Sequence, residues 1–299
     1  MTASAPGVLP SVTPNEAVAR TNSHYELPPE VFAAFLGTSM KYSCGLYSGP
    51  ESTLDQAQEA KLAWVVDANL RLRPGQRLLD VGCGWGSLVL FAARRGIEVV
   101  GVTPSRPQRE HILRRAAELG VADLVEVRLG GFTESDLSGR RFDGVAMIGS
   151  IVHMPDRAEV LLRAYELLGP KGRLYLSESC FRNRKIFDAY RRSPGFEFVG
   201  GEIFGFGEMV PLSDLIAAAE EAGFSIVKLT DLTTHYPRTL ADWEERVRDR
   251  RNQIDALIPG TADRLLRYFK IGSVGFGFTT KHYAFAAEKS RMGRLEGVE

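Results

Sequence analysis

The sequence predicts an α/β fold in which a parallel sheet carries helices on both faces, an arrangement called doubly wound. From Arg77 onward, short apolar runs of strand length alternate with segments of helical pattern. The first of these runs leads directly into a glycine-rich loop. The composition is that of a globular protein, with 44% hydrophobic and 25% charged residues in a chain of 299. Regular alternation of strands and helices is typical of parallel sheets.

The sequence contains no internal repeat, so each expected element is given once in chain order. Strands are predicted at 77–81, 98–102, 124–129, 142–148 and 172–178, with helices at 88–95, 107–119 and 157–168 between them. The pair Gly169-Pro170 ends the last of these helices. Further along, the pattern predicts a helix at 212–222, a strand at 225–231, an amphipathic helix at 240–257 and a closing strand at 281–288.

Changes in composition divide the chain into segments. Residues 1–20, rich in Pro, Ser, Thr and Ala, are expected to form a flexible N-terminal arm, and 290–299 a flexible tail. Residues 21–70 are expected to form a helical lid, with helices at 29–36 and 54–70. Residues 71–289 form the main domain, in which the aromatic segment 181–210 interrupts the strand–helix rhythm and is interpreted as an inserted cap.

The charge balance and the cysteines exclude several classes of protein. The 37 basic and 37 acidic residues give no net charge, which argues against nucleic-acid binding and against a charge-driven membrane anchor. The sequence contains no run of about 18 apolar residues, which is the length needed to span a membrane. Cys44, Cys83 and Cys180 are scattered and form no Cys-x-x-Cys pair, so neither a disulfide framework nor a metal site is expected. This use of cysteine predicts a cytoplasmic location.

A glycine loop follows the first strand and opens a helix. Its glycines are Gly82, Gly84 and Gly86, and an acidic residue, Asp80, stands just before them. Glycine allows a tight turn and close approach of the backbone to a ligand, and the helix N-terminus favours an anionic group. The spacing differs from the G-x-G-x-x-G of dinucleotide-binding loops and is typical of S-adenosylmethionine (SAM) loops. The alternative is a tight strand–helix turn that binds nothing.

The second strand departs from the usual pattern of nucleotide-binding sheets. Such a strand normally ends in an acidic residue that binds ribose hydroxyls. Here it is followed by Thr103 and Pro104, and Gln108 comes shortly after, with no acidic residue between.

Together, these and other motifs resemble the cyclopropane-fatty-acyl-phospholipid synthase family, which includes the mycolic acid cyclopropane synthases and methyltransferases. The resemblance covers about residues 22–288. The segments that carry it, in chain order, are 24–25, 40–44, 53–61, 79–86, 102–108 and 235–243. No one of these segments is specific by itself, but their combination is.

The resemblance implies a Rossmann-like class I methyltransferase sheet and SAM as the cofactor. Cofactor contacts are implied at Tyr42, Ser43, Gly82, Gly84, Thr103, Gln108 and Ile148, and we assign the adjacent Asp80, Cys83 and Pro104 to the same site. Phe132 lies where the family carries an aromatic residue against the adenine. The alternative for Phe132 is a plain core residue.

The family's bicarbonate ion is doubtful in this chain. Its side-chain ligands in the relatives are a Cys, a Glu, a His and a Tyr. Cys44 and Tyr236 match two of them, whereas Val152 and Ser177 stand in place of the Glu and the His. Because a valine side chain has no hydrogen-bonding atom, we do not expect the ion to be held as in the relatives. Cyclopropanation of an unactivated alkene is therefore also in doubt.

The candidate catalytic residues are Glu178, His153, Tyr236 and Cys44. Glu178 ends the fifth strand and is a candidate base, or alternatively a solvated strand end paired with a nearby arginine. His153 is a second candidate base, or a residue that orders its loop. Tyr236 is expected to position the substrate or stabilise a developing cation. Cys44 matches a family position, and we interpret it as a small buried residue rather than a nucleophile.

The sequence thus predicts a SAM-dependent methyltransferase that acts on carbon, or as a lesser alternative nitrogen, of an apolar small molecule in specialised metabolism. The alternatives are ring-forming methylene transfer to a lipid or natural product, and a SAM-binding protein without catalysis. The expected partner is an apolar or acyl substrate, and a homo-oligomer is left open. The aromatic cap suits the wall of an apolar pocket, or alternatively a small separate core.

Overall fold

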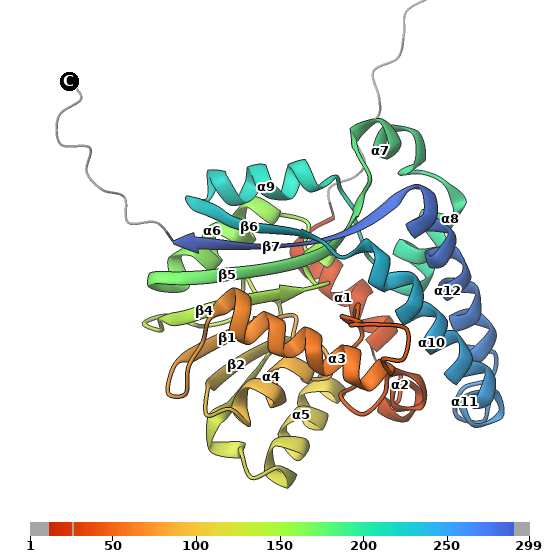
Figure 1. The fold of residues 1–299 in the computed structure, drawn as a ribbon, viewed down its shortest axis with the longest axis horizontal. Helices are drawn as coiled ribbons and strands as arrows, with labels where there is room; N and C mark the ends of the chain where they lie inside the picture. Colours follow the sequence, from red (N-terminus) through yellow and green to blue (C-terminus); the bar gives the residue numbers. More distant parts are fainter. Residues whose placement is uncertain (1–11, 26, 290–299) are drawn as a thin grey trace, which may run out of the picture.

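The computed structural model describes residues 12–25 and 27–289 and centres on a seven-stranded sheet (Figure 1). The strand order is β3-β2-β1-β4-β5-β7-β6. The strands are β1 (Arg77–Val81), β2 (Glu98–Thr103), β3 (Val125–Leu129), β4 (Phe142–Ile148), β5 (Leu168–Phe181), β6 (Phe224–Asp231) and β7 (Thr280–Lys289). The predicted α/β class is confirmed.

The sheet is mixed, because one of its seven strands runs against the others. β1 to β5 pair in parallel, but β7 lies between β5 and β6 and runs antiparallel to both. Thr280, the first residue of β7, pairs with Phe181, the last residue of β5. The chain therefore enters β7 from the edge where the parallel strands end, and it can only run back in the opposite direction.

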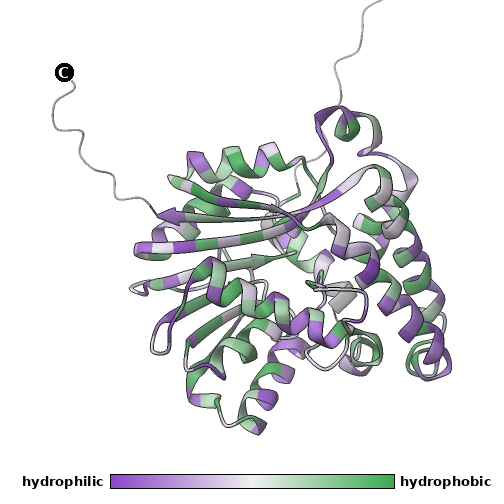
Figure 2. Cartoon of the chain, viewed as in Figure 1, coloured by the Kyte–Doolittle hydropathy of each residue, from purple (hydrophilic) through white to green (hydrophobic). Residues whose placement is uncertain are grey.

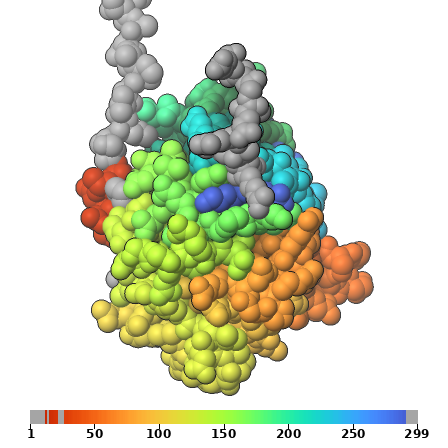
Figure 3. Space-filling model, turned by 90° about the vertical axis from the view of Figure 1, so that its left-hand side faces the viewer, coloured from red at the N-terminus to blue at the C-terminus, as the bar shows by residue number. Residues whose placement is uncertain are grey.

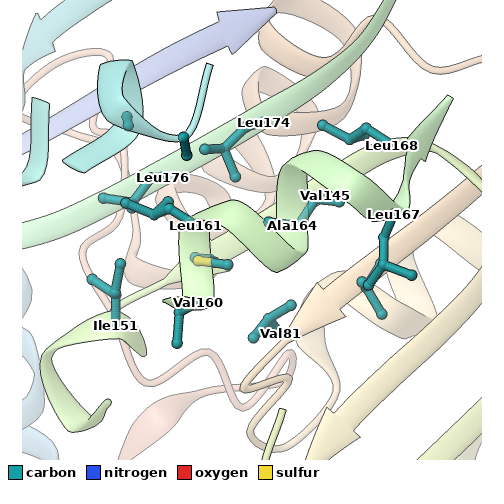
Figure 4. Packing of buried hydrophobic residues seen from close by; sticks show 14 of the residues in the cluster. Val81, Val145, Ile151, Val160, Leu161, Ala164, Leu167, Leu168, Leu174 and Leu176 are labelled. Carbon is teal, nitrogen blue, oxygen red and sulfur yellow. The ribbon is translucent and has the colours of Figure 1, made fainter. Parts of the chain in front are cut away.

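Helices cover both faces of the sheet, as predicted for a doubly wound fold. On one face lie α3 (Leu54–Ala63), η1 (Trp64–Leu70), α4 (Ser87–Ala93) and α5 (Arg106–Glu118). On the other face lie α6 (Arg157–Leu167) and α9 (Leu212–Glu221). Figure 4 shows how Leu161 and Ala164 of α6 pack against Val145 and Leu174 of the sheet. The short 3-10 turns are η2 (Ala122–Leu124), η3 (Ile151–His153) and η5 (Thr233–His235).

The predicted helix at 54–70 changes its winding partway. It begins with a capping box in which Thr53 and Gln56 satisfy each other's backbone N–H groups, and it becomes the π-helix η1 at Trp64. Arg173 of β5 donates to the carbonyl of Asn69 at 2.9 Å, which ties the end of η1 to the sheet. Figure 3 shows the orange segment that holds α3 and η1 lying against the green segment of the sheet.

A second layer of helices packs beside the sheet around an aromatic core. It contains α2 (Pro29–Leu36), η4 (Phe198–Ile203), α10 (Tyr236–Asp249), α11 (Arg251–Leu257) and α12 (Thr261–Phe278). Two short helices, α7 (Arg184–Tyr190) and α8 (Pro194–Glu197), lead from β5 to η4 and bury no residue in this core. Phe35, Trp243 and Phe269 are fully buried at its centre, with ring centroids 5.7–6.1 Å apart. Hydrophilic residues mark the outer sides of these helices in Figure 2. The predicted helix at 240–257 is two helices, and α12 was not predicted.

The expected arm at 1–20 is shorter than predicted, because α1 (Pro14–Tyr25) is a helix. The backbone N–H of Thr13 donates to the Glu16 carboxylate at 2.9 Å, and the backbone N–H of Glu16 donates to the Thr13 hydroxyl at 3.3 Å. This reciprocal cap stabilises the start of the helix. Ala17 and Thr21, four residues apart, are buried on the same side of α1. The rest of the predicted arm, 1–11, and the predicted tail, 290–299, lie outside the described residues.

Trp243→Ala should destabilise the fold by about 3–5 kcal/mol, because the mutation leaves a cavity in the centre of the aromatic core. The matched control is Val274→Ala on α12, whose side chain is 68% exposed. The control should change the free energy of unfolding by less than about 0.5 kcal/mol. Chemical denaturation followed by circular dichroism measures both, and equal effects of the two mutations would contradict this account of the helical layer.

Candidate functional site

One pocket opens at the edge of the sheet where β1, β2 and β4 end. It encloses about 1030 Å³ of empty space, counted together with its open mouth. The pocket brings together all eleven residues predicted to bind the cofactor: Tyr42, Ser43, Asp80, Gly82, Cys83, Gly84, Thr103, Pro104, Gln108, Phe132 and Ile148. Val18 and Thr21 of α1 also line it, although the sequence analysis placed no site residue there. The Thr13-x-x-Glu16 capping signal could have revealed this helix.

The glycine loop leaves space for a ligand at its tip. Gly82, Gly84 and Gly86 have φ angles of 74°, 53° and 82°, which are left-handed and favour glycine. A Cβ atom on Gly82 would lie 2.4 Å from the Cβ of Ser150, so no larger residue fits there. A Cβ atom on Gly84 would meet no atom within 4 Å, because this residue faces the open pocket. A ligand can therefore approach the backbone of Gly84 closely.

Asp80 places a carboxyl group in the wall of the pocket. Its side chain is 3% exposed, and burial raises its pKa to about 7. A buried carboxylate is stabilised when an opposite charge lies beside it. The position of Asp80 therefore suits a ligand with a cationic group.

At the end of β2, an amide and a hydroxyl stand where an acidic residue is usual. The hydroxyl of Thr103 donates to the side-chain oxygen of Gln108 at 2.6 Å. The backbone N–H of Ser105 donates to the same Thr103 hydroxyl at 3.2 Å. These bonds hold Gln108 in one orientation at the start of α5, where it can meet the hydroxyl groups of a ligand.

Phe132 lies between the pocket and the hydrophobic core. It lines the pocket, and it is also part of the hydrophobic cluster beneath α6. The guanidinium of Arg163 lies 5.3 Å from its ring centroid. The ring is therefore held firmly while it presents a surface to the pocket.

Among the four candidate catalytic residues, His153 lines the pocket. Its Nδ1 lies 2.6 Å from the carbonyl oxygen of Phe206. A carbonyl can only accept, so Nδ1 carries the proton and Nε2 is left with a lone pair. Burial lowers the pKa of this imidazole, which keeps it neutral near pH 7. His153 can therefore accept a proton at Nε2.

Glu178 does not line this pocket, contrary to the expectation that it faces it. Successive side chains of a strand point to opposite faces. Glu178 shares its face with Leu176 and Cys180, which pack toward α6 and α9. Its carboxylate accepts from the backbone N–H groups of Ser179 and Val152 at 2.9 and 3.4 Å, and burial raises its pKa to about 7.

Cys44 and Tyr236 lie on the other side of the sheet from Glu178. Cys44 is fully buried, its thiol donates to the carbonyl of Gly45 at 3.0 Å, and burial raises its pKa. The ring of Tyr236 stacks on Phe276 with centroids 4.4 Å apart and lies 4.9 Å from the ring of His282. A protonated, buried thiol agrees with the interpretation of Cys44 as a packing residue.

Three buried basic residues near Cys44 were not among the site residues predicted from the sequence. They are Lys41, Lys61 and His282, with exposed fractions of 2%, 0% and 2%. Lys61 lies four residues after the buried Ala57, on the buried side of α3, and this spacing was a signal in the sequence.

Two negative findings apply to the residues that the structure describes. Across residues 12–25 and 27–289, no three His, Cys, Asp or Glu side chains are grouped so that they could hold a metal ion. Within the same ranges, every helix is too short or too polar to cross a membrane.

Comparison with known proteins gives a consistent result. The family model for mycolic acid cyclopropane synthetase matches residues 13–281. The chain is 32% identical over 252 residues to a probable fatty acid methyltransferase of Pseudomonas putida, and 33% identical over 225 residues to one of Mycobacterium tuberculosis. These matches cover 83% and 74% of this chain, but 63% and 50% of the two relatives.

A solved structure agrees with the sequence matches. The mycolic acid cyclopropane synthase CmaA1 complexed with SAH and CTAB superposes with a TM-score of 0.83 at 26% identity, over 91% of this chain and 98% of that one. The match of the family model over most of the chain, the two relatives and this shared fold together identify the chain as a member of the mycolic acid cyclopropane synthetase family.

Proposed function

We propose that this chain is a SAM-dependent methyltransferase that delivers a methyl group to carbon of an apolar acceptor. The observation that carries the proposal is the pocket, which collects the glycine loop, a buried carboxyl group and a fixed amide–hydroxyl pair at one edge of the sheet. Ligands of open α/β sheets bind at this edge. Membership of the family and the SAH complex of CmaA1 support the proposal.

The residues of the pocket suit the chemistry of SAM. When bound, SAM supplies a methyl group on a positively charged sulfur. The buried carboxylate of Asp80 balances positive charge, and the open backbone at Gly84 allows close approach. The hydrogen-bonded pair Thr103–Gln108 suits ribose hydroxyls, and the flat ring of Phe132 suits the adenine.

An aromatic layer beside the pocket supports an apolar acceptor. Tyr42 lines the pocket and lies 6.2 Å from the ring of Phe204, which in turn lies 5.4 Å from the ring of His153. Aromatic rings of this kind bind acyl or other apolar groups by burying their surface. The names of the relatives, fatty acid methyltransferases and mycolic acid synthases, agree with an acyl acceptor. Three buried free cysteines support a reducing, cytoplasmic location.

His153 is the proposed proton acceptor of the reaction. Methyl transfer to a carbon–carbon double bond leaves a carbocation, which must lose a proton. The Nε2 lone pair of His153 is directed by the bond from Nδ1 to Phe206. Methylation and ring formation both add one CH2 to the acceptor, so an NMR spectrum of the product, rather than its mass, distinguishes a new methyl group from a cyclopropane.

Gly84→Ala should weaken SAH binding by about tenfold or more, because its methyl group would project into the pocket. Gly120→Ala is the matched control, since Gly120 also has a left-handed φ of 68° and no atom within 4 Å of its Cβ position, but it lies outside the pocket. Both mutations carry the same backbone cost. Isothermal titration calorimetry measures the affinity, and equal losses in both variants would argue against SAM binding at this loop.

SAM affinity should rise with pH up to about 7, because the cation needs the ionised form of Asp80 and burial raises the pKa of this residue to about 7. Below that pH the association constant should fall by up to about tenfold per pH unit.

The effect of Asp80 on the stability of the free protein has the opposite sign. Its contribution to the free energy of unfolding is greatest below pH 3.8 and is lost as the pH rises through about 7.

In the variant Asp80→Asn, this dependence of SAM affinity on pH should disappear. Calorimetry between pH 5.5 and 8 on the two proteins provides the comparison. An unchanged pH profile in the variant would show that another group binds the cation.

His153→Gln should lower kcat by about 10²- to 10⁴-fold, because it removes the proton acceptor. The affinity for SAH should stay nearly unchanged. Glu178→Gln, whose side chain lies outside the pocket lining and binds backbone N–H groups, should keep activity near the level of the native protein. Turnover is measured as SAH release with unsaturated acyl substrates, and the reverse ranking of the two variants would make Glu178 the base.

A further inference from the structure

The last part of the inserted cap runs beside η3, the turn that carries His153, and we call residues 204–208 the strap. The strap follows η4 and has no regular secondary structure. Two hydrogen bonds join it to η3. The backbone N–H of Glu208 donates to the carbonyl of Val152 at 2.8 Å, and the carbonyl of Phe206 accepts from Nδ1 of His153 at 2.6 Å. The strap therefore decides which ring nitrogen of His153 carries the proton.

Close contacts constrain the path of the strap. A Cβ atom on Gly200 would lie 2.8 Å from the carbonyl oxygen of Gly207, so η4 and the strap cross without room for a side chain. A Cβ atom on Gly207 would lie 3.8 Å from the imidazole of His153. The ring of Phe204 lies 5.4 Å from that imidazole and 5.5 Å from the ring of Tyr268. A displaced strap would therefore change the surroundings of His153 directly.

Arg157 of α6 holds the end of the strap. Its Nη2 donates to the backbone carbonyl of Glu208 at 2.5 Å and to the carboxylate of the same residue at 3.0 Å. The side chain of Arg157 is 14% exposed, whereas that of Glu208 is 49% exposed. A hydrogen bond from a charged group that is largely shielded from water is stronger than a neutral or fully exposed one. The guanidinium thus anchors the residue that also binds the carbonyl of Val152.

The helix itself does not explain why an arginine stands at this position. Arg157 is the first residue of α6, directly after the N-cap Asp156, which accepts from the backbone N–H of Glu159 at 3.0 Å. A helix N-terminus favours negative charge, so a cation there is unfavourable. Within the described residues, Nε of Arg157 is also buried without a hydrogen-bond partner, which adds a further cost. Residues that break a local preference are expected at functional sites, and here the contact that offsets these costs is the strap.

We propose that Arg157 is a positioning residue that acts on His153 through the strap. By holding Glu208, it keeps the carbonyl of Phe206 against Nδ1 of the imidazole, and Nε2 is left to accept a proton. This inference rests on the proposed function, in which His153 takes the proton that the methylated acceptor loses. Without the strap, the imidazole proton can sit on either nitrogen, and an Nε2 that carries it cannot accept another. Arg157 lies outside the pocket lining, so its effect is indirect.

NMR of the histidine ring nitrogens tests the proposal, because their chemical shifts show which nitrogen carries the proton. The chain has five histidines, and the signal of His153 is the one that disappears in His153→Gln. Burial lowers the pKa of His153, so the imidazole is neutral at about pH 8. At that pH we expect the proton on Nδ1 alone in the native protein. In Arg157→Met, the two nitrogens should share the proton, or Nε2 should carry it.

Turnover provides a second measurement. Arg157→Met should lower kcat by about ten- to hundredfold, because the proton acceptor is misplaced. The affinity for SAH should stay near that of the native protein, since Arg157 does not line the pocket. Arg157→Lys keeps the charge and a donor, and it should recover part of the lost kcat.

Arg184→Met is the matched control. Arg184 is likewise the first residue of a helix, α7 of the cap, and it forms an ion pair with Asp214 that does not involve the strap. This variant should keep the native kcat and the proton of His153 on Nδ1. If Arg184→Met moves the proton as far as Arg157→Met does, the strap is not the route and the proposal is overturned.

A second variant covers the case in which Arg157→Met does not fold. Glu208→Ala removes the half-exposed carboxylate and keeps the backbone carbonyl, so it should move the proton of His153 in the same direction but less far. A proton that stays on Nδ1 in Arg157→Met, or in Glu208→Ala where Arg157→Met does not fold, overturns the proposal. A fall in kcat with the proton still on Nδ1 overturns it as well, because the loss is then a general structural effect.

The two measurements separate this inference from the proposed function. If the proton of His153 moves in Arg157→Met but His153→Gln turns over as fast as the native protein, Arg157 positions the imidazole and His153 is not the base. If SAH binds and His153→Gln is inactive, but Arg157→Met leaves the proton on Nδ1, this inference alone is wrong.

Discussion

The close approach between the turns after β1 and β4 is the constraint on which the site depends. Gly82 leaves no room for a side chain because Ser150 lies against it, and the hydroxyl of Ser150 donates to the carbonyl of Val81 at 2.6 Å. This contact holds the ends of the two strands together. Asp80 and Ile148 then line one pocket, although 68 positions separate them in the chain. The left-handed backbone at Gly84 opens the same turn toward the ligand.

The pleat of β5 separates two kinds of chemistry. Glu178 points toward α6 and α9, where backbone N–H groups bind its carboxylate. Ser177, one residue earlier, belongs to the face that holds Lys61 and His282. A shift of one residue in the strand would exchange these two environments. The acidic group and the basic groups are therefore kept apart by the sheet itself.

The aromatic layer connects the helical elements to the pocket at the edge of the sheet. Tyr42 lines the pocket, and its ring lies 5.3 Å from that of Trp243 and 5.7 Å from that of Phe35. Because the core of this layer is closely packed, the position of Tyr42 depends on helices that are far away in the chain. The stability of the helical layer and the shape of the pocket are thus linked by the same side chains.

The sequence by itself determined the α/β class, most strands and the set of residues that the structure gathers in one pocket, because these follow from local patterns: apolar runs, glycine spacing and family motifs. It left α12 and the antiparallel course of β7 unpredicted, since both depend on where the chain re-enters the sheet. It also missed His282 and misplaced Glu178 relative to the pocket. Only the tertiary structure decides which face of a buried strand meets which helix, because a strand buried on both faces has no hydrophobic alternation to read.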